Sequence, residues 1–290
     1  MSKPLTTDDF RAVRIVLEPE DFALTDGKPD VPDDPIDRET WNGIMVLPDD
    51  VAIRTSNHKG EWLKELYHQQ TLWTEYAVGD SDNSDILFEA MLYTMDELDA
   101  ALFLNLHGFY RQSIGCLRNT LEIVTVGTYL HIYNLSDDLK LWNDGKKKIP
   151  FGAACDHLNN VRPVRKLQAH LRAELKDSLF ETVNKAPKAG WVRRLYDTLC
   201  SYAHSQPDMT NVNMWKSNGP IYVPGAFHQA MNLFIDTIMT GYLLVKLARP
   251  SSGLPDDTKA WFESFKEDEE DRTMYEVYRY LFRNAPQGNS

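Results

Sequence analysis

The chain has 290 residues, of which 42% are hydrophobic and 26% are charged. This share of apolar side chains supports a folded core and excludes a largely disordered protein. The net charge of −12 at pH 7 argues against a general nucleic-acid coat, because sequence-independent binding needs many Lys and Arg side chains to neutralise phosphates. A local basic site stays open, since Lys and Arg cluster within residues 146–166 and 185–194.

Three features predict a cytoplasmic protein without a membrane partner. The first ten residues contain no apolar run, unlike a secretion signal or a transit peptide. The most apolar late segment, residues 226–248, is interrupted by His228, Asn232 and Asp236, whereas a membrane-spanning helix needs about 20 nearly uncharged residues. The cysteines at positions 116, 155 and 200 have no close pair and are typical of reduced thiols.

The N-terminal region predicts an extended arm over residues 1–55. Residues 18–50 are rich in Asp and Pro, and Pro29, Pro32 and Pro35 are spaced too closely for a helix. The apolar residues within 41–47 indicate that the arm lies against the core, with a short strand near residues 44–47.

The central region, residues 56–250, predicts the helical core. Apolar residues recur at three- and four-residue intervals over residues 61–76, which indicates an amphipathic helix, and Ser84 is the expected N-cap of the next one. Residues 85–133 contain no proline and are too long for one typical helix, so we expect a break near His107, Gly108 and Phe109. Two antiparallel helices would then form a long hairpin at the heart of the fold.

Further helices are expected along the rest of the chain. The spacing of apolar residues predicts helices at 153–158, 164–175, 191–204 and 226–247, with an ordered loop over 207–224. Residues 251–290 predict accessory helices near 257–265 and 269–283. The fold class that follows is all-α: a helical bundle built on the long antiparallel hairpin, with the extended N-terminal arm and the C-terminal accessory helices attached.

One polar face lies on the second helix of the predicted hairpin. Arg111, Arg118 and Glu122 are seven and four residues apart, so they fall within a narrow sector of that helix. Gly115 on the same face could let another helix or a ligand come close. The opposite sector is apolar, so Arg118 and Glu122 are either partners in a structural salt bridge or part of a functional polar cavity.

A second polar face lies on the helix predicted at residues 191–204. Arg193, Asp197, Ser201 and His204 are four, four and three residues apart and share one side of it. The imidazole of His204 could hydrogen-bond a carboxylate, donate to a phosphate, or act as general acid and base near neutral pH. The alternative is that His204 is a satisfied core residue.

No metal site and no cofactor is predicted. Cys155 and His157 supply two potential ligands, but zinc needs three or four, and no Cys-x-x-Cys or His-Glu-x-x-His spacing accompanies them. The sequence also lacks a glycine-rich phosphate loop and a Gly-x-Ser-x-Gly turn. P-loop nucleotide hydrolysis and ordinary esterase chemistry therefore have no support.

Two motifs resemble those of uncharacterised bacterial all-α proteins. Gly108-Phe109 followed by Leu117-Arg118-x-x-x-Glu122 is similar to their Gly-aromatic turn and Leu-Arg-x-x-x-Glu helix. Residues 196–204 resemble their later Tyr-x-x-Leu-Ser-x-x-x-His helix, with the Leu-Ser pair shifted by one. Those proteins are themselves similar to the HEPN superfamily of helical bundles, and the resemblance covers residues 85–248.

The resemblance implies a protein that binds RNA or a nucleotide, since HEPN members include metal-independent endoribonucleases of toxin–antitoxin, defence and CRISPR systems. It implies catalytic roles for His204 as general acid or base, Arg118 as a phosphate contact, and Glu122 as the residue that orients either of them. The further residues expected to bind phosphate or ligand are Arg111, Arg193 and Ser201.

The match to the nuclease signature of that superfamily is incomplete. The signature is an Arg followed by a His after four to six intervening residues at a dimer interface, and His204 has no Arg at this distance. Arg165 and His170 do have the spacing. The competing hypothesis is a non-catalytic interaction or assembly protein, with a protein partner or as a homodimer, whose polar faces are buried networks that fix helix register.

Overall fold

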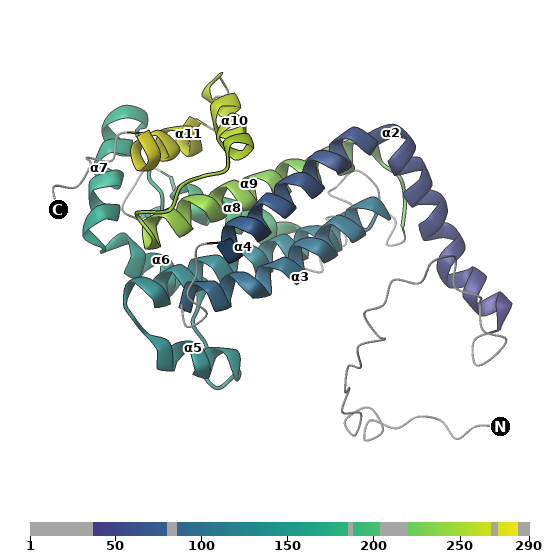
Figure 1. Cartoon of the computed structure of the whole chain (residues 1–290), viewed down its shortest axis with the longest axis horizontal. Coiled ribbons are helices and arrows are strands. Elements are labelled where there is room, and N and C mark those ends of the chain that lie inside the picture. Colours follow the sequence, from purple (N-terminus) through teal and green to yellow (C-terminus); the bar gives the residue numbers. More distant parts are fainter. Residues whose placement is uncertain (1–36, 80–85, 185–187, 204–219, 268–271, 284–290) are drawn as a thin grey trace. The chain divides into compact units, whose positions relative to one another are not determined.

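The computed structural model describes residues 37–79, 86–184, 188–203, 220–267 and 272–283 (Figure 1). The chain divides into two compact units, residues 1–45 and 46–290. The described residues form helices joined by short connections, with no strand among them. The predicted all-α helical bundle is therefore confirmed.

Helix α2 (Arg38–Gly79) occupies a region that was predicted in part as an extended arm. Asp37 caps its start, because the carboxylate accepts hydrogen bonds from the backbone N–H and the hydroxyl of Thr40, each at 2.9 Å. The helix continues through Pro48 and bends at Lys59, whose backbone angles (φ −133°, ψ 17°) are not helical. The extended arm predicted for residues 38–55, with its strand at 44–47, is therefore wrong. Residues 1–36 lie outside the described part.

Helices α3 (Ile86–Leu106) and α4 (Tyr110–Ile132) pack along each other. They divide at residues 107–109, where Gly108 has a φ of +77°, a left-handed conformation that favours glycine. The backbones come close at Gly127, since a Cβ atom there would lie 2.5 Å from the Cβ of Ala90. By contrast, nothing lies within 4 Å of a Cβ built on Gly115, so among the described residues no helix packs closely there.

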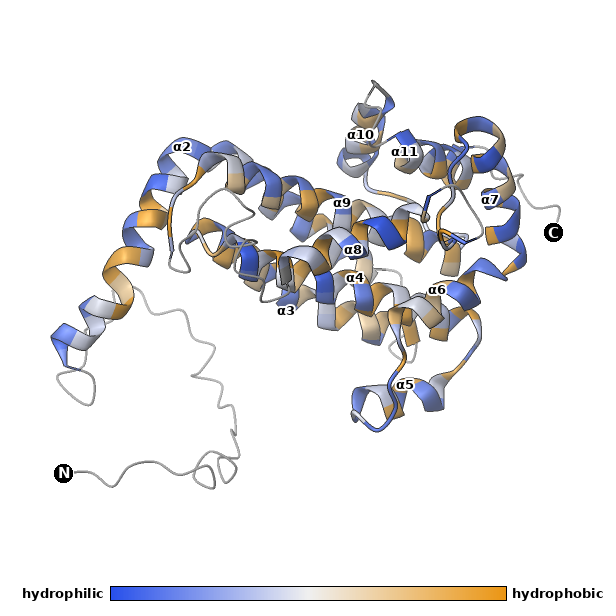
Figure 2. Ribbon diagram, turned by 180° about the vertical axis from the view of Figure 1, so that it is seen from behind, coloured by the Kyte–Doolittle hydropathy of each residue, from blue (hydrophilic) through white to orange (hydrophobic). Residues whose placement is uncertain are grey.

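Helix α9 (Pro224–Ala248) packs beside α4 and is largely hydrophobic (Figure 2). Its residues are buried on nearly all sides. A Cβ atom on Gly241 would lie 2.8 Å from the ring of Trp73 in α2, and that ring meets Tyr242 edge-on with centroids 5.1 Å apart. Among the described helices, α9 alone is long and apolar enough to cross a membrane, but 83% of its most apolar window is buried within the protein. This burial is typical of a core helix in a soluble protein.

Shorter helices complete the bundle. They are α5 (Ser136–Asn143), α6 (Phe151–Asn159), α7 (Arg162–Leu175), α8 (Trp191–Ala203), α10 (Asp256–Ser264) and α11 (Arg272–Tyr278). A 3-10 turn follows α10 at Phe265–Glu267, and a π-helical turn follows α11 at Arg279–Arg283. Helix α5 was not predicted from the sequence, and most of the loop expected over residues 207–224 lies outside the described residues.

Asp177 joins the start of α8 to α11. Its buried carboxylate accepts two hydrogen bonds from Arg194, each at 2.9 Å, and lies 3.0 Å from the ammonium of Lys188. Thr273 of α11 donates to it at 2.6 Å. Burial opposes the ionisation of Asp177, but these donors outweigh burial and lower its pKa to about 2. The charged carboxylate therefore ties the start of α8 to α11.

Candidate functional site

The interface between α4 and α8 brings Arg118 and Glu122 together with Tyr196, which the sequence analysis did not select. The Nη2 atom of Arg118 lies 3.0 Å from Oε2 of Glu122, so the expected salt bridge is formed. The hydroxyl of Tyr196 accepts a hydrogen bond from the same Nη2 at 2.6 Å and donates to Oε2 of Glu122 at 3.0 Å. Burial and the negative charge of Glu122 raise the pKa of Tyr196, so the phenol keeps its proton.

The remaining donors of the Arg118 guanidinium are also engaged. Its Nε donates to Sγ of Cys200 at 3.2 Å, and its Nη1 donates to Oδ1 of Asn119 at 3.2 Å. The guanidinium carbon lies 5.1 Å from the ring centre of Tyr196, in a cation–π contact. The side chains of Arg118 and Glu122 are each 30% exposed. The network is therefore reachable from solvent, yet each nitrogen of the Arg118 guanidinium has a partner within the protein.

Arg111 reaches from the first turn of α4 to the end of α8. Its Nε donates to the backbone carbonyl of Tyr202 at 3.1 Å, and Tyr202 lies two positions before His204 in the sequence. Among the described residues, the two terminal nitrogens of Arg111 have no acceptor. A guanidinium with both terminal groups available can bind a phosphate in bidentate geometry. Arg111 is therefore the cation of this interface best suited to hold an anion.

Arg193 and Ser201 make contacts different from those expected of ligand-binding residues. The Arg193 side chain is 14% exposed, and it donates to the carbonyl of Phe180 at 2.5 Å, the carbonyl of Gly152 at 3.2 Å and Oδ1 of Asp156 at 2.8 Å. It thus ties α8 to α6 and to the segment before α8, which conflicts with its expected role as a ligand contact. The hydroxyl of Ser201 donates to the backbone carbonyl three residues earlier at 2.6 Å.

Two histidines were selected from the sequence, His204 and His170. His204 lies outside the described residues. His170 is on α7, where its Nε2 is 3.7 Å from Oε2 of Glu276 and its ring centre is 5.2 Å from that of Tyr280. Arg165, the partner of His170 by spacing, is exposed. His170 therefore lies on the side of α7 near the C-terminal helices, and its described contacts do not include α4 or α8.

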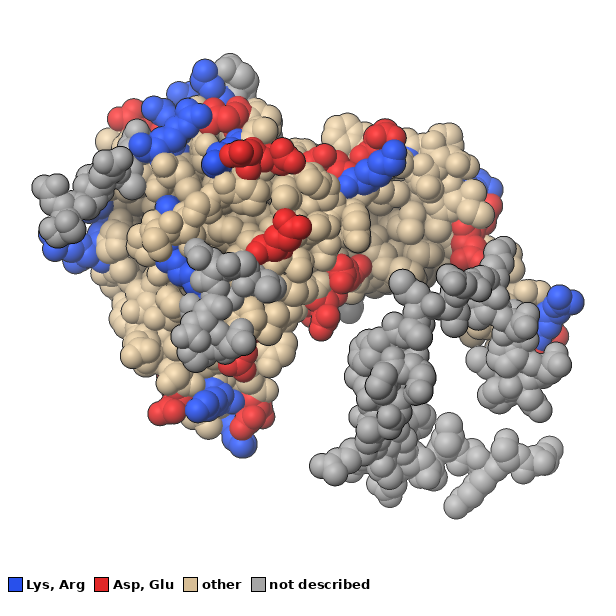
Figure 3. Space-filling view, viewed as in Figure 1, with Lys and Arg blue, Asp and Glu red and all other residues tan. Residues whose placement is uncertain are grey.

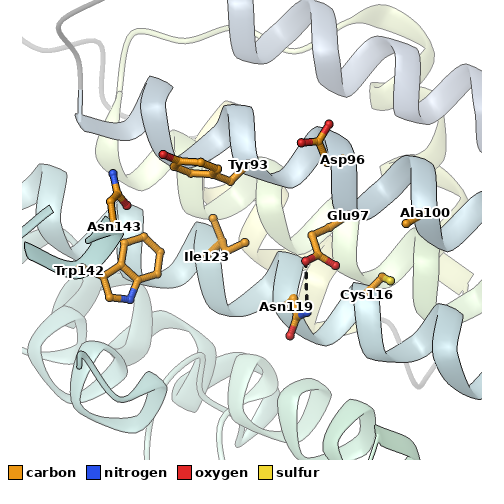
Figure 4. Close-up of a pocket in the computed structure, with 9 residues that line it drawn as sticks. All are labelled: Tyr93, Asp96, Glu97, Ala100, Cys116, Asn119, Ile123, Trp142 and Asn143. Atoms are coloured by element: carbon orange, nitrogen blue, oxygen red, sulfur yellow. Dashed lines mark hydrogen bonds between the residues drawn. The ribbon is translucent and has the colours of Figure 1, made fainter. Parts of the chain in front are cut away.

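A groove with a volume of about 740 Å³ lies between α3, α4 and α5 (Figure 4). Asn119 connects the groove to the Arg118 network, because its Oδ1 accepts from Arg118 and its Nδ2 donates to Oε1 of Glu97 at 3.2 Å.

Charged side chains are unevenly spread over the surface. On the face shown in Figure 3, acidic side chains stand over the middle of the bundle, and Lys and Arg gather toward the end where α5, α7 and α11 lie.

The spacing of polar residues in the sequence could have predicted the contact between α4 and α8. Arg118 and Glu122 are one turn apart on α4, and Tyr196 and Cys200 are one turn apart on α8, which is the spacing of polar side chains that interlock between two helices. The face predicted from the sequence was the neighbouring one, where Arg193, Asp197, Ser201 and His204 share one side at spacings of four, four and three residues.

No family model, no curated protein and no solved structure matches this chain. Within the part of the chain that the structure describes, no group of three or more His, Cys, Asp or Glu side chains is arranged to hold a metal ion. The α4–α8 interface is therefore the candidate functional site.

Proposed function

We propose that the α4–α8 face binds the phosphate of RNA or of a nucleotide, in the cytoplasm, and that Arg111 holds this phosphate. The observation that carries the proposal is the hydrogen bond from Nε of Arg111 to the carbonyl of Tyr202 at 3.1 Å. It sets a guanidinium beside the end of α8, two positions before His204. A cation that binds phosphate and an imidazole that transfers protons are the groups that RNA cleavage without a metal requires.

Arg118 and Glu122 are positioning residues in this proposal. Glu122 and Tyr196 hold the guanidinium of Arg118, and Arg118 in turn holds Cys200 of α8. His204 acts as general acid or base on the 2′-hydroxyl of RNA, so the proposed activity extends to a metal-independent endoribonuclease. The proposed setting, a bacterial defence or toxin–antitoxin system, comes from the resemblance to HEPN proteins alone.

Binding of fluorescein-labelled single-stranded RNA, followed by fluorescence anisotropy, tests the role of Arg111. We expect Arg111→Gln to weaken binding by about tenfold, since a charge-assisted hydrogen bond to phosphate is lost. Arg165→Gln is the matched control, because it removes the same charge from an exposed Arg on α7. If Arg165→Gln weakens binding and Arg111→Gln does not, the phosphate site lies on α7 and the proposal is wrong.

A second candidate function, a non-catalytic interaction protein, is favoured by one observation. Arg118 forms an ion pair with Glu122 and donates to Tyr196, Cys200 and Asn119, and a network satisfied in this way fixes the register of two helices without any ligand. This candidate predicts that no RNA or nucleotide binds at any tested concentration. Light scattering after size-exclusion chromatography would then test whether the chain forms a homodimer, as one form of this candidate predicts.

A further inference from the structure

The groove between α3, α4 and α5 combines aromatic and acidic side chains. Figure 4 shows the rings of Tyr93 on α3 and Trp142 on α5 at one end, and Glu97 on α3 facing Asn119 and Cys116 on α4 farther along. Tyr93 is 46% exposed, so its ring is available to a bound group. The two kinds of side chain come from different helices, and the packing of α3, α4 and α5 places them around one volume of about 740 Å³.

The negative charge of this groove is not balanced by residues that line it. No Lys, Arg or His is among the lining residues. Glu97 accepts a hydrogen bond from the neutral amide of Asn119, and Asp96 has no cationic partner among the described residues. Two neighbouring groups respond to this charge. Burial first, and then Glu97, raise the pKa of the Cys116 thiol to about 12, and burial together with Asp96 raises the pKa of Asp99.

A site in which aromatic rings lie beside carboxylates is suited to bind an organic cation. A guanidinium or ammonium group gains from the π-face of Trp or Tyr and from the charge of Asp or Glu at the same time. The groove is open to solvent rather than enclosed, whereas sites for small molecules enclose most of the ligand surface. An extended chain that presents basic side chains therefore fits it better than a small cation does.

We propose that this groove is a docking site for a basic segment of a partner protein, which inserts an Arg or Lys side chain between Tyr93 and Trp142 and pairs it with Asp96 and Glu97. The site differs from the proposed phosphate site in its charge preference, and Asn119 lies between the two, in contact with both Arg118 and Glu97. RNA phosphates are repelled from Asp96 and Glu97, so one protein can bind both partners on different sides of α4.

The test uses the full chain and a fluorescein-labelled octapeptide of alternating Arg and Gly, with an octapeptide of alternating Glu and Gly as the negative probe. We expect the Arg peptide to bind, and Asp96→Asn/Glu97→Gln to weaken binding by about tenfold or more. The matched control is Asp49→Asn/Asp50→Asn, which removes the same charge from two exposed residues of α2 outside the groove. This control is expected to bind within about twofold of the wild type, since screened charges at a distance contribute little.

Tyr93→Leu separates the aromatic contribution from the charge, because Leu keeps an apolar side chain without a π-face. We expect it to weaken the Arg peptide by about threefold. Thermal melting followed by circular dichroism checks that each variant is folded. Equal weakening in the two double variants would show that net charge alone attracts the peptide, and this overturns the proposal. If spermidine binds but the Arg peptide does not, the groove takes a small polyamine instead, and the docking proposal is wrong.

Discussion

The phenol of Tyr196 contacts the guanidinium of Arg118 in two ways: its hydroxyl oxygen lies 2.6 Å from Nη2, and its ring centre lies 5.1 Å from the guanidinium carbon. The same hydroxyl donates to Glu122. Tyr196 therefore links the two charged groups, and its removal takes a hydrogen-bond donor from Glu122 and a cation–π partner from Arg118.

Arg118→Ala should destabilise the protein by roughly 1–3 kcal/mol, because it leaves the carboxylate of Glu122 without its cation. The double variant Arg118→Met/Glu122→Leu should be less destabilised, since it removes both charges and their desolvation cost. Urea denaturation of the two variants measures the difference. An Arg118→Ala variant as stable as the wild type would contradict this account of the network.

Two glycines of α4 should respond in opposite directions to the same substitution. Gly115→Ala should stabilise the protein by about 0.5–1 kcal/mol, because the new methyl group meets open space and alanine favours the helix. Gly127→Ala should destabilise it by about 1–3 kcal/mol, because the methyl group would meet Ala90 of α3. Thermal melting compares them. Partial rescue of Gly127→Ala by Ala90→Gly is the further expectation, and equal effects at both glycines would contradict the close packing at Gly127.

Acid should destabilise the protein partly through Asp177. Its folded-state pKa is lowered from 3.8 to about 2, so the charged carboxylate contributes its full stability above about pH 4, and this contribution is lost as the pH falls toward 2. A shift of this size corresponds to roughly 2 kcal/mol. Asp177→Asn should therefore be less stable than the wild type at pH 7 and lose less stability between pH 5 and pH 2.

Denaturation in urea at several pH values measures this dependence. Asp256→Asn is a suitable control, since Asp256 pairs with Lys259 on the surface, where ion pairs contribute little. An Asp177→Asn variant that shows the full acid dependence of the wild type would mean that other carboxylates carry the effect.

The helices at residues 86–132 could be predicted because their apolar spacing is local, and because His107-Gly108-Phe109 interrupts a stretch without proline. The start of α2 could not, since Pro48 and the nearby Asp residues are typical of extended chain, and the helix is recognisable only from the Asp37–Thr40 cap. The salt bridge from Arg118 to Glu122 follows from a spacing of four within one helix.

The residues of α8 that contact this salt bridge could not be predicted in the same way. Helix α8 has two polar faces, one with Tyr196 and Cys200 and one with Arg193. The periodicity of α8 alone does not show which of the two packs against α4. That choice depends on tertiary contacts, among them the tie from Asp177 to Arg194 at the start of α8.

Cleavage of labelled RNA in the presence of EDTA tests the central claim most directly, with wild type, His204→Ala and His170→Ala assayed side by side. The account predicts cleavage without a metal, products that end in 2′,3′-cyclic phosphate, and a loss of roughly 10²–10⁴-fold in rate for folded His204→Ala, because a general acid–base group is removed. His170→Ala should cleave like the wild type. Abolished cleavage in His170→Ala with normal cleavage in His204→Ala would move the site to α7, and no cleavage by the wild type would contradict the nuclease claim itself.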